Sequence, residues 1–342
     1  MKKIYVLLAF CAMVLMPQFT LAKVITMTTS KEVDETIKLY IDGENVTLEG
    51  VEGTFVSQKR VSYVLTSQTI VIKGDVKGLT CNSMSLVSLV LSDDVELESL
   101  NCSDNELTSL DVSKQVGLLR LDCFGNKLSS LDVTKNVALV HLDCGTNALT
   151  SLDVSKNTAL NDLACTRNNI SEINVSQNLN LTRLNCAINK ISKLDVSKNI
   201  LLNNLACHSN LLNYLDVSKN SKLRQLSIYL NRLNGDGMQS FVELLPSIPA
   251  NLYVIAPEDP AEKNVMTTSQ VEMVKAKGWG VCTNEGVNYS GSQEPTGVSS
   301  RGCDENVAVV AIYDSYGRQY QEIQKGINVL KMSDGTVIKV FK

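Results

Sequence analysis

The sequence predicts a mostly-β solenoid built from coils of 21 residues. Two observations predict this fold: a cysteine recurs at an unbroken spacing of 21 residues, and a leucine stands two residues before each of these cysteines. Self-similarity at such a period is typical of repeat architectures, in which a unit buries its apolar face only against its neighbours. The series comprises Cys81, Cys102, Cys123, Cys144, Cys165, Cys186 and Cys207, and Ile228 continues its phase.

The repeating unit reads LxxLxCxxNxLxxLDVSKNxx. In LxxLxC the second leucine and the cysteine are two residues apart, so they share one face of a strand, and the leucine and valine of LxxLDV do the same. We therefore expect two short inward-facing strands in each coil, with successive coils about 4.8 Å apart. The asparagine three residues after the cysteine, from Asn105 to Asn231, is expected to turn the chain and to bond backbone groups inside the coil.

This unit resembles the leucine-rich-repeat family, and most of all its bacterial internalin-like forms. The resemblance covers residues 76–234 and departs from the usual consensus by placing cysteine where a third leucine would stand. A free cysteine behaves as a small buried hydrophobe, so this change is compatible with the fold. The resemblance implies a solenoid that mediates contacts with other proteins.

The segments on either side of the repeats are expected to close the ends of the array, because repeat arrays need polar caps. Residues 23–75 read as a β cap with strands at 36–41, 60–66 and 69–73, and with turns at Gly43, Gly50 and Gly53. Residues 235–283 read as two longer coils that carry helices at 237–245 and 268–277, the second capped by Ser269. Residues 284–306, rich in Gly, Ser, Asn and Glu, read as a linker.

The N-terminus predicts export, and residues 1–22 read as a signal peptide. Lys2 and Lys3 precede an apolar stretch over 4–16, and Thr20-Leu21-Ala22 provides a small-residue cleavage site. A transmembrane anchor is the alternative, but the apolar run is short for spanning a bilayer. Lipidation at Cys11 is a second alternative. We therefore expect a secreted or cell-surface protein, with association with an outer membrane left open and no transmembrane segment further along the chain.

The last segment, 307–342, is β-patterned and resembles the C-terminal sorting domain of proteins exported by the type IX secretion route. The residues that carry the resemblance are Ile312, Tyr313 and Asp314, then Gly317-Arg318, Lys325-Gly326 and Lys339. The resemblance implies that this segment engages secretion machinery. A simple terminal β-module is the alternative.

Several classes of chemistry find no support in the sequence. The formal net charge of -4 offers no basic surplus for nucleic acid. The chain has no CxxC pair for zinc, and its two histidines, His141 and His208, lie three coils or about 14 Å apart, too far to share a metal. We expect no catalytic constellation, no cofactor and no metal, and we expect the regularly spaced cysteines to be reduced. Pairing of Cys282 with Cys303 stays open.

The aspartate row of the LDVSKN segments allows two interpretations, calcium binding and a solvated turn. The glycine-rich nonapeptide of calcium-binding β-rolls is missing, and a lysine that could balance each aspartate follows it by three residues in most copies. A structural turn is therefore the favoured interpretation.

The outward positions of the LxxLxC strands predict the binding surface. These positions vary from coil to coil while the LDVSKN segments stay nearly constant, which favours a non-enzymatic exported protein that binds a protein or glycan partner. A structural scaffold of the cell envelope without a specific ligand is the alternative. Phe124, Arg120, Arg183 and Tyr229 are expected to contribute most, since arginine and aromatic residues are typical interface anchors. The predicted face contains Arg120, Asp122, Phe124, His141, Asp143, Asp162, Thr166, Arg183, Asn185, Asn204, His208, Gln225 and Tyr229.

Overall fold

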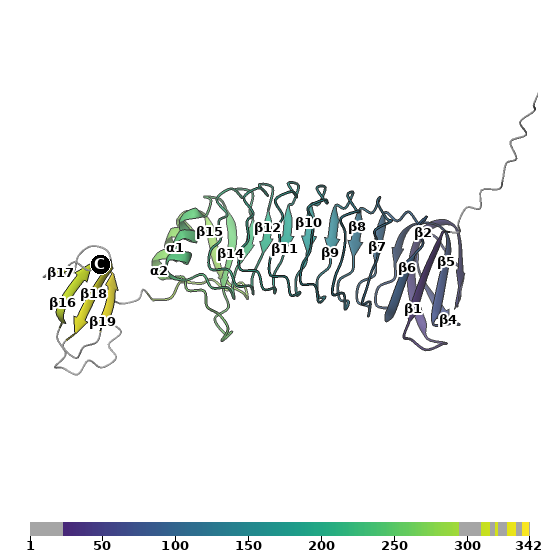
Figure 1. Cartoon of the computed structure of the whole chain (residues 1–342), viewed down its shortest axis with the longest axis horizontal. Coiled ribbons are helices and arrows are strands. Elements are labelled where there is room, and N and C mark those ends of the chain that lie inside the picture. Colours follow the sequence, from purple (N-terminus) through teal and green to yellow (C-terminus); the bar gives the residue numbers. More distant parts are fainter. Residues whose placement is uncertain (1–22, 294–308, 315–318, 321–326, 333–336, 342) are drawn as a thin grey trace, which may run out of the picture.

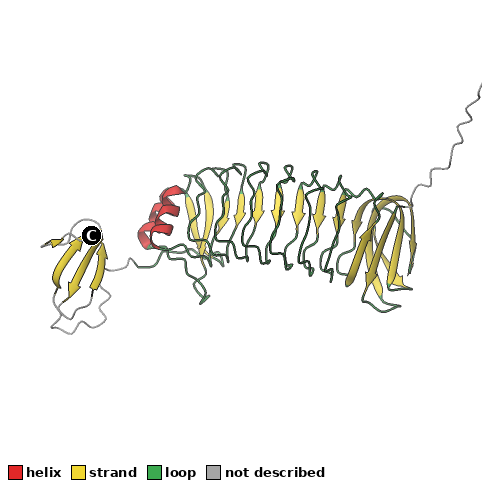
Figure 2. Ribbon diagram, in the orientation of Figure 1, coloured by secondary structure: helices red, strands yellow, loops and turns green. Residues whose placement is uncertain are grey.

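A computed structural model shows one strand per coil, stacked in parallel along an elongated solenoid (Figures 1 and 2). The structure describes residues 23–293 and, further on, 309–314, 319–320, 327–332 and 337–341. The predicted signal peptide and Cys303 lie outside the described residues. The repeat strands are β7 (Ser99–Asn101), β8 (Arg120–Asp122), β9 (His141–Asp143), β10 (Asp162–Ala164), β11 (Arg183–Asn185), β12 (Asn204–Ala206) and β13 (Gln225–Ser227).

The register of the parallel ladder follows the 21-residue period. Leu121 of β8 pairs with Leu142 of β9, which pairs with Leu163 of β10, so equivalent residues of successive coils lie side by side. The inner leucines are at most 1% exposed, and the ladder cysteines are completely buried. Burial of one such leucine stabilises the fold by about 1.5–3 kcal/mol, and every coil repeats it. The predicted solenoid is thereby confirmed.

Only one of the two strands expected in each coil forms. In the LDV segments the apolar side chains do point inward, with Leu131 at 8% and Val133 at 0% exposure, but the backbone forms no strand there. Instead, the Asp132 carboxylate accepts a hydrogen bond from the backbone N–H of Thr134 at 2.9 Å. This local turn replaces pairing between neighbouring coils, so the prediction of a second strand was wrong.

The predicted asparagine ladder is confirmed. Asn147 is representative: its Nδ2 donates to the carbonyls of Cys123 and Cys144, both at 3.1 Å, and its Oδ1 accepts from the N–H of Leu128 at 2.9 Å. The side chain thus satisfies backbone groups of two successive coils at the point where the chain turns. Such bonds explain why asparagine stands at this position in each coil from Asn105 to Asn231.

A second, deeper asparagine ladder was not assigned a role from the sequence. Asn157 donates to the carbonyls of Val133 and Asn136 at 2.9 Å, and its side chain is completely buried. Its Oδ1 is buried without a hydrogen-bond partner, as are the same atoms of the equivalent asparagines. The constant asparagine at the end of DVSKN therefore ties each turn to the preceding one. The ladder consists of Asn136, Asn157, Asn178, Asn199 and Asn220.

The N-terminal cap is continuous with the solenoid because both share one long strand. Strand β5 (Thr69–Thr80) pairs antiparallel with β2 (Thr36–Glu49), while its last residues pair in parallel with β7. Strands β3 (Val51–Glu52) and β4 (Arg60–Leu65) extend the sheet beyond β2, and β1 (Val24–Thr29) bridges β5 and β6 (Leu86–Leu91). Gly43 lies inside β2, at a register shift, and not at the expected turn.

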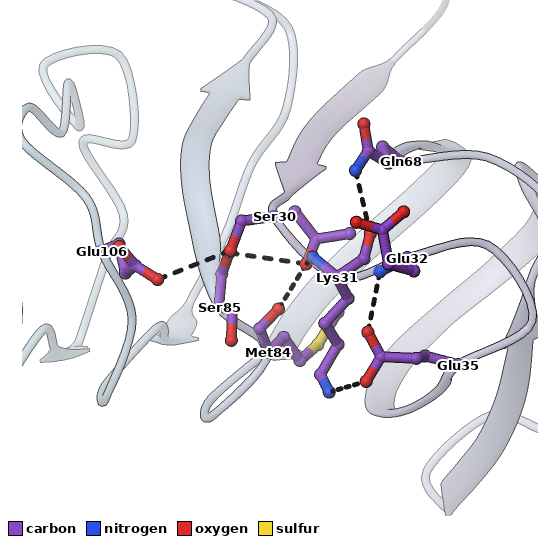
Figure 3. A network of polar contacts seen from close by, with 9 residues as sticks. Ser30, Lys31, Glu32, Glu35, Gln68, Met84, Ser85 and Glu106 are labelled. Carbon is purple, nitrogen blue, oxygen red and sulfur yellow. Dashed lines mark hydrogen bonds and ion pairs between the residues drawn. The ribbon is translucent and has the colours of Figure 1, made fainter.

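Side-chain contacts also fasten the cap to the first coils. Thr29 Oγ1 donates to the carbonyl of Met84 at 2.6 Å, and Ser30 reaches Glu106 of the following coil at 3.5 Å (Figure 3). The turn after β1 is itself held by an ion pair between Lys31 and Glu35 at 3.1 Å. The cap therefore extends through β6, past the boundary at residue 75 that the sequence suggested.

Two longer coils close the other end, as expected. They contain α1 (Gly235–Leu244), β14 (Ala250–Ile255), α2 (Thr268–Ala276) and β15 (Trp279–Thr283), and both strands continue the parallel ladder after β13. The N-cap of α2 is Thr267, which forms a capping box with Gln270, and not Ser269 as expected.

The segment after β15 folds back along its edge. Tyr289 N–H donates to the carbonyl of Val281, and Thr283 N–H to that of Val287, both at 2.8 Å. These bonds use the free edge of the last strand, so residues up to Ser292 cover the end of the array where a linker from 284 was expected.

The C-terminal segment forms a separate antiparallel sheet in the order β17-β16-β18-β19. Its strands are β16 (Val309–Asp314), β17 (Gln319–Tyr320), β18 (Ile327–Met332) and β19 (Val337–Phe341). The β character predicted for this segment is present.

Candidate binding face

The outward side chains of β8–β13 form one continuous face. Since equivalent residues lie in register, the positions before the inner leucine form a row across the coils. We call the whole surface, which also includes the positions just before and after the cysteine, the strand face. Its first row contains Arg120, His141, Asp162, Arg183, Asn204 and Gln225.

Three of the predicted binding residues also have a structural role. Asp122, Asp143 and Asn185 stand just before the cysteine, and their Oδ1 atoms accept from the backbone N–H two residues on, at 3.2, 2.9 and 3.2 Å. One side-chain oxygen of each is therefore committed to shaping the turn after the strand. Partial burial raises the pKa of the Asp122 and Asp143 carboxyl groups above the ordinary value.

Asp162 joins three coils. Its Oδ2 lies 3.0 Å from His141 Nδ1 of the preceding coil and also forms an ion pair with Arg183 of the following coil. The Asp162 side chain is only 16% exposed, whereas that of Arg183 is 61% exposed. Arg183 is thus oriented by the protein itself while most of its surface faces solvent.

Phe124 is packed more closely than the sequence suggested. Its ring lies over Gly145 of the next coil, where an added Cβ would stand 3.1 Å from Phe124 Cδ2. The ring is half-buried, so it is an aromatic patch on the face and not an unpartnered outward side chain.

His208 and Tyr229 form a stacked pair at the other end of the face. Their ring centroids are 4.2 Å apart and the rings are within 12° of parallel. Burial and the nearby Arg167 charge lower the pKa of His208 to about 4, so its ring is neutral at neutral pH. The 21-residue period brings together two aromatic positions whose stacking could have been read from the sequence.

A shallow groove of about 940 Å³ opens at the start of β12–β14. It is lined by eight residues, none of them acidic, and they include Lys222, Arg224 and Asn251. The β8–β10 part of the face differs, because it carries Asp122, Asp143 and Asp162. The groove is therefore amide-rich and basic, whereas the β8–β10 part of the strand face carries three aspartates beside Arg120 and His141.

The turns formed by the LDVSKN segments make up the opposite surface, which we call the turn side. Asp111, Asp153 and Asp195 each accept from a serine N–H two residues on at 2.9 Å, and this hydrogen bonding lowers the pKa of their carboxyl groups. The structure therefore supports the interpretation of this row as structural turns. Lys114 forms its ion pair with Asp93 at 3.6 Å, and not with the aspartate three residues before it.

One surface feature was missed from the sequence. A row of apolar side chains, each more than half exposed, follows the buried asparagine or glutamine of the turn side. The signal was present in the repeat, at the position after DVSKN, but a single exposed apolar residue carries no information by itself. The row consists of Val116, Val137, Leu179 and Ile200.

Three further observations concern metals, membranes and thiols. Within the described part of the chain, no group of three or more His, Cys, Asp or Glu side chains is arranged to hold a metal, and no helix could cross a bilayer. All seven ladder cysteines are free, and burial raises the pKa of the Cys81 and Cys186 thiols to about 12. They are protonated, buried packing groups, as expected. Cys282 is free and half-buried.

The period, the single inward strand per coil and the asparagine ladder define a leucine-rich-repeat solenoid. No protein-family model and no curated protein sequence matches the chain. Among solved structures it is similar to the functional domain of InlJ from Listeria monocytogenes, which includes a cysteine ladder. The two share 26% identity over 64% of this chain and 62% of that one, with a TM-score of 0.34.

Two other similar structures are a leucine-rich-repeat protein of Leptospira interrogans and an internalin of Listeria monocytogenes. The first shares 20% identity over 55% of this chain and 48% of its own, with a TM-score of 0.44. The second shares 15% identity over 60% of this chain and 66% of its own, with a TM-score of 0.43. The matched region spans less than two thirds of each of these three proteins.

Proposed function

We propose that the protein is an exported, non-enzymatic binding module that recognises a protein or glycan partner through its strand face. The observation that carries the proposal is the contrast between the two surfaces of the same coils. On the turn side the repeated residues make turn and ladder hydrogen bonds. On the strand face the first row changes from arginine to histidine, aspartate and asparagine without changing the fold.

Two local features support recognition on this face. Arg183 is held by Asp162 yet largely exposed, which lowers the entropy lost when it binds a partner. Phe124 and the His208–Tyr229 pair provide rigid aromatic surface at both ends of the face. Rigid arginine and aromatic groups are common among the residues that dominate interfaces.

Export and placement remain part of the proposal. Residues 1–22 are proposed to direct secretion, and 307–342 to engage secretion machinery and bring the protein to the cell surface or beyond it. The mature chain should then begin at Lys23, which mass spectrometry of exported protein can verify. An intact Met1 or a lipid on Cys11 would contradict this part.

Arrays of glycans and of extracellular protein domains, probed with the purified protein, test the binding function. Affinity for the strongest hit is then measured for Arg120→Ala, Phe124→Ala, Arg183→Ala and Tyr229→Ala. We expect losses of about 1 kcal/mol or more at some of these positions with little change in melting temperature. Lys135→Ala, Lys156→Ala and Lys198→Ala on the turn side are the controls.

If the four strand-face variants bind normally while the lysine variants do not, the turn side is the working surface and the proposal is wrong. If neither array gives a hit and the protein assembles with itself, the scaffold alternative replaces it.

A further inference from the structure

Exposed apolar side chains of two adjacent coils gather at the edge of the solenoid where β8 and β9 begin. Leu119 and Val140 stand just before these strands, and each is 41% exposed. The N–H of Val140 donates to the carbonyl of Leu119 at 2.9 Å, so the two residues lie side by side. Val116 and Val137 precede them by three residues and are more than half exposed. We call Val116, Leu119, Val137 and Val140 the edge patch.

The repeat does not require the edge patch. No other coil from β7 to β13 has exposed apolar side chains at both of these positions. The coil of β10 has Thr158 and Asn161 there, and the coil of β11 has Leu179 and Thr182. Since the solenoid forms with polar residues at these positions, packing does not explain the four apolar side chains. Contiguous exposed apolar surface is typical of sites that contact another molecule.

Carboxylates without counter-ions lie beside the edge patch on the strand face. Asp122 and Asp143 follow Leu119 and Val140 by three residues, which is about 10 Å along a strand. Burial, and to a smaller extent the charge of Asp104, raises the pKa of Asp122. None of these three aspartates forms an ion pair within residues 23–293.

The cations of β8 and β9 do not balance these carboxylates. His141 is directed toward Asp162, with 3.0 Å between Nδ1 and Oδ2. Arg120 is exposed and forms no ion pair among the described residues. One guanidinium therefore lies beside three carboxylates, and a cation brought by a partner would stabilise their charged forms.

This combination favours a protein partner over a glycan or a lipid surface. Aliphatic side chains gain free energy when they leave water against other apolar groups, which a glycan rich in hydroxyl groups does not offer. An acidic glycan or an anionic lipid surface would also be repelled by the carboxylates. A protein segment can present apolar and basic side chains about 10 Å apart, and so it matches both features.

We propose that this surface binds a protein segment in which aliphatic side chains stand next to a lysine or arginine. The aliphatic side chains pack on Leu119 and Val140. The basic group lies between Asp122 and Asp143, which pair in register on adjacent coils about 4.8 Å apart. The ring of Phe124, two residues after Asp122, adds a cation–π contact to this group. The inference rests on the proposed function and narrows its partner to a protein.

Fluorescence anisotropy titration with three labelled peptides of equal length tests the inference. A leucine–lysine peptide carries both features, a serine–lysine peptide lacks the apolar side chains, and a leucine–glutamate peptide carries the opposite charge. At physiological salt we expect the leucine–lysine peptide to bind about tenfold more tightly than either of the others.

Two double variants separate the apolar contribution from the charged one. Leu119→Asn with Val140→Asn should weaken binding of the leucine–lysine peptide about tenfold. Asp122→Asn with Asp143→Asn should weaken it about five- to tenfold. Both changes introduce asparagine, which equivalent positions of other coils already hold, so the solenoid should fold normally. The strongest protein hit of the arrays should depend on the same two double variants.

Matched controls lie elsewhere on the solenoid. Leu179→Thr with Ile200→Thr removes two exposed apolar side chains from the same edge, on coils that lack the unpaired aspartates. Glu258→Gln with Glu285→Gln removes two exposed carboxylates near the C-terminal end of the array. Neither control should change binding of the leucine–lysine peptide. Circular dichroism melting of every variant separates a lost contact from a lost fold.

The inference is wrong if the leucine–lysine peptide binds no more tightly than the other two, or if the controls weaken it as much as the two double variants do. Binding of phosphatidylserine vesicles that depends on Leu119 and Val140 would assign the edge patch to a lipid surface instead. If the array hit is a glycan that depends on Arg183 and Tyr229 but on neither double variant, the proposed function stands and the protein site does not. If the hit is lost only in the turn-side lysine variants, both are wrong.

Discussion

The strand face and the turn side are two surfaces of the same coils, yet their sequences vary to different extents from coil to coil. On the turn side an aspartate shapes the turn and a buried asparagine ties it to the preceding coil, so the sequence hardly changes. On the strand face the inward leucine and cysteine are fixed, whereas their outward neighbours are free to differ. Constancy in this repeat therefore marks residues with backbone partners, and variation marks the surface available for recognition.

Asp122 and Asp143 combine the two roles, because each shapes a turn and also lies on the strand face. Each commits one oxygen to a turn, and Asp122 Oδ2 also accepts from Asn101 Nδ2 at 3.1 Å, yet both side chains are only half-buried on the strand face. At the equivalent positions in other coils the chain has Ala164 and Ala206. The turn after the strand therefore forms without such a bond, which makes these aspartates candidates for binding.

The largest effect is expected from a charge placed in the shared core. Cys144→Asp buries a carboxylate without a partner and should lower the free energy of unfolding by about 4 kcal/mol or more. Urea unfolding followed by circular dichroism measures the loss. Cys144→Val keeps an apolar side chain of similar size and should cost less than about 1.5 kcal/mol. Equal losses in the two variants would contradict the packing role of the cysteine ladder.

The second-largest effect on the free energy of unfolding is expected at Asn157, and it is compared with Asn185 on the other surface. Asn157→Ala leaves the buried carbonyls of Val133 and Asn136 without their donor and should cost about 2–4 kcal/mol. Asn185→Ala removes one turn bond at a half-exposed site and should cost less than about 1 kcal/mol. The same unfolding measurement serves for both. A larger loss at Asn185 would reverse the distinction drawn between the surfaces.

A smaller effect concerns pH. The folded protein holds the pKa of His208 at about 4, below its ordinary value of 6.5. Between these values the unfolded chain binds more protons, so His208 makes the folded state lose stability as the pH falls from about 6.5 to 4. The melting temperature of His208→Gln should therefore fall less over this pH range than that of the wild-type protein.

The difference between the pH profiles of the wild-type protein and His208→Gln isolates the contribution of the imidazole to stability. The raised pKa of Asp122 and of Asp143 acts in the opposite direction, since protonation of these carboxyls on acidification favours the folded state. Both contributions are present in the wild-type protein and in the variant, so they cancel. Identical pH profiles for the two proteins would show that His208 is not held in its neutral form.

The smallest effect on stability is expected from removing residues 307–342. The repeats and both ends of the array are complete by Ser292, so the melting temperature of the solenoid should not change. If the tail is a sorting domain, the truncated protein should no longer reach its normal location, as measured by fractionation of cells and medium. Unchanged secretion and surface display would favour a simple terminal β-module.

Sequence patterns identified the residues of the strand face but not their local environments. The 21-residue spacing placed Arg120, His141 and Arg183 in one row, as the ladder register shows. The spacing did not reveal that Asp162 links His141 to Arg183, or that the Phe124 ring packs against Gly145. Such contacts depend on side-chain rotamers between neighbouring coils, which a repeat pattern does not specify.

The sequence by itself determined the coil length, the inward residues and the asparagine ladder, because stacking forces equivalent residues into register and any polar side chain placed inside must find backbone partners. Only the tertiary structure decided that each coil has one strand, that β5 joins the cap to the solenoid, and that residues 287–289 cover the edge of β15. These features arise from competition for backbone hydrogen bonds. At Asp132 a side-chain oxygen, and not a neighbouring coil, accepts from the backbone N–H, and at each end of the array a segment distant in sequence pairs with the terminal strand. The outcome of that competition depends on which groups meet in space, which local sequence does not encode.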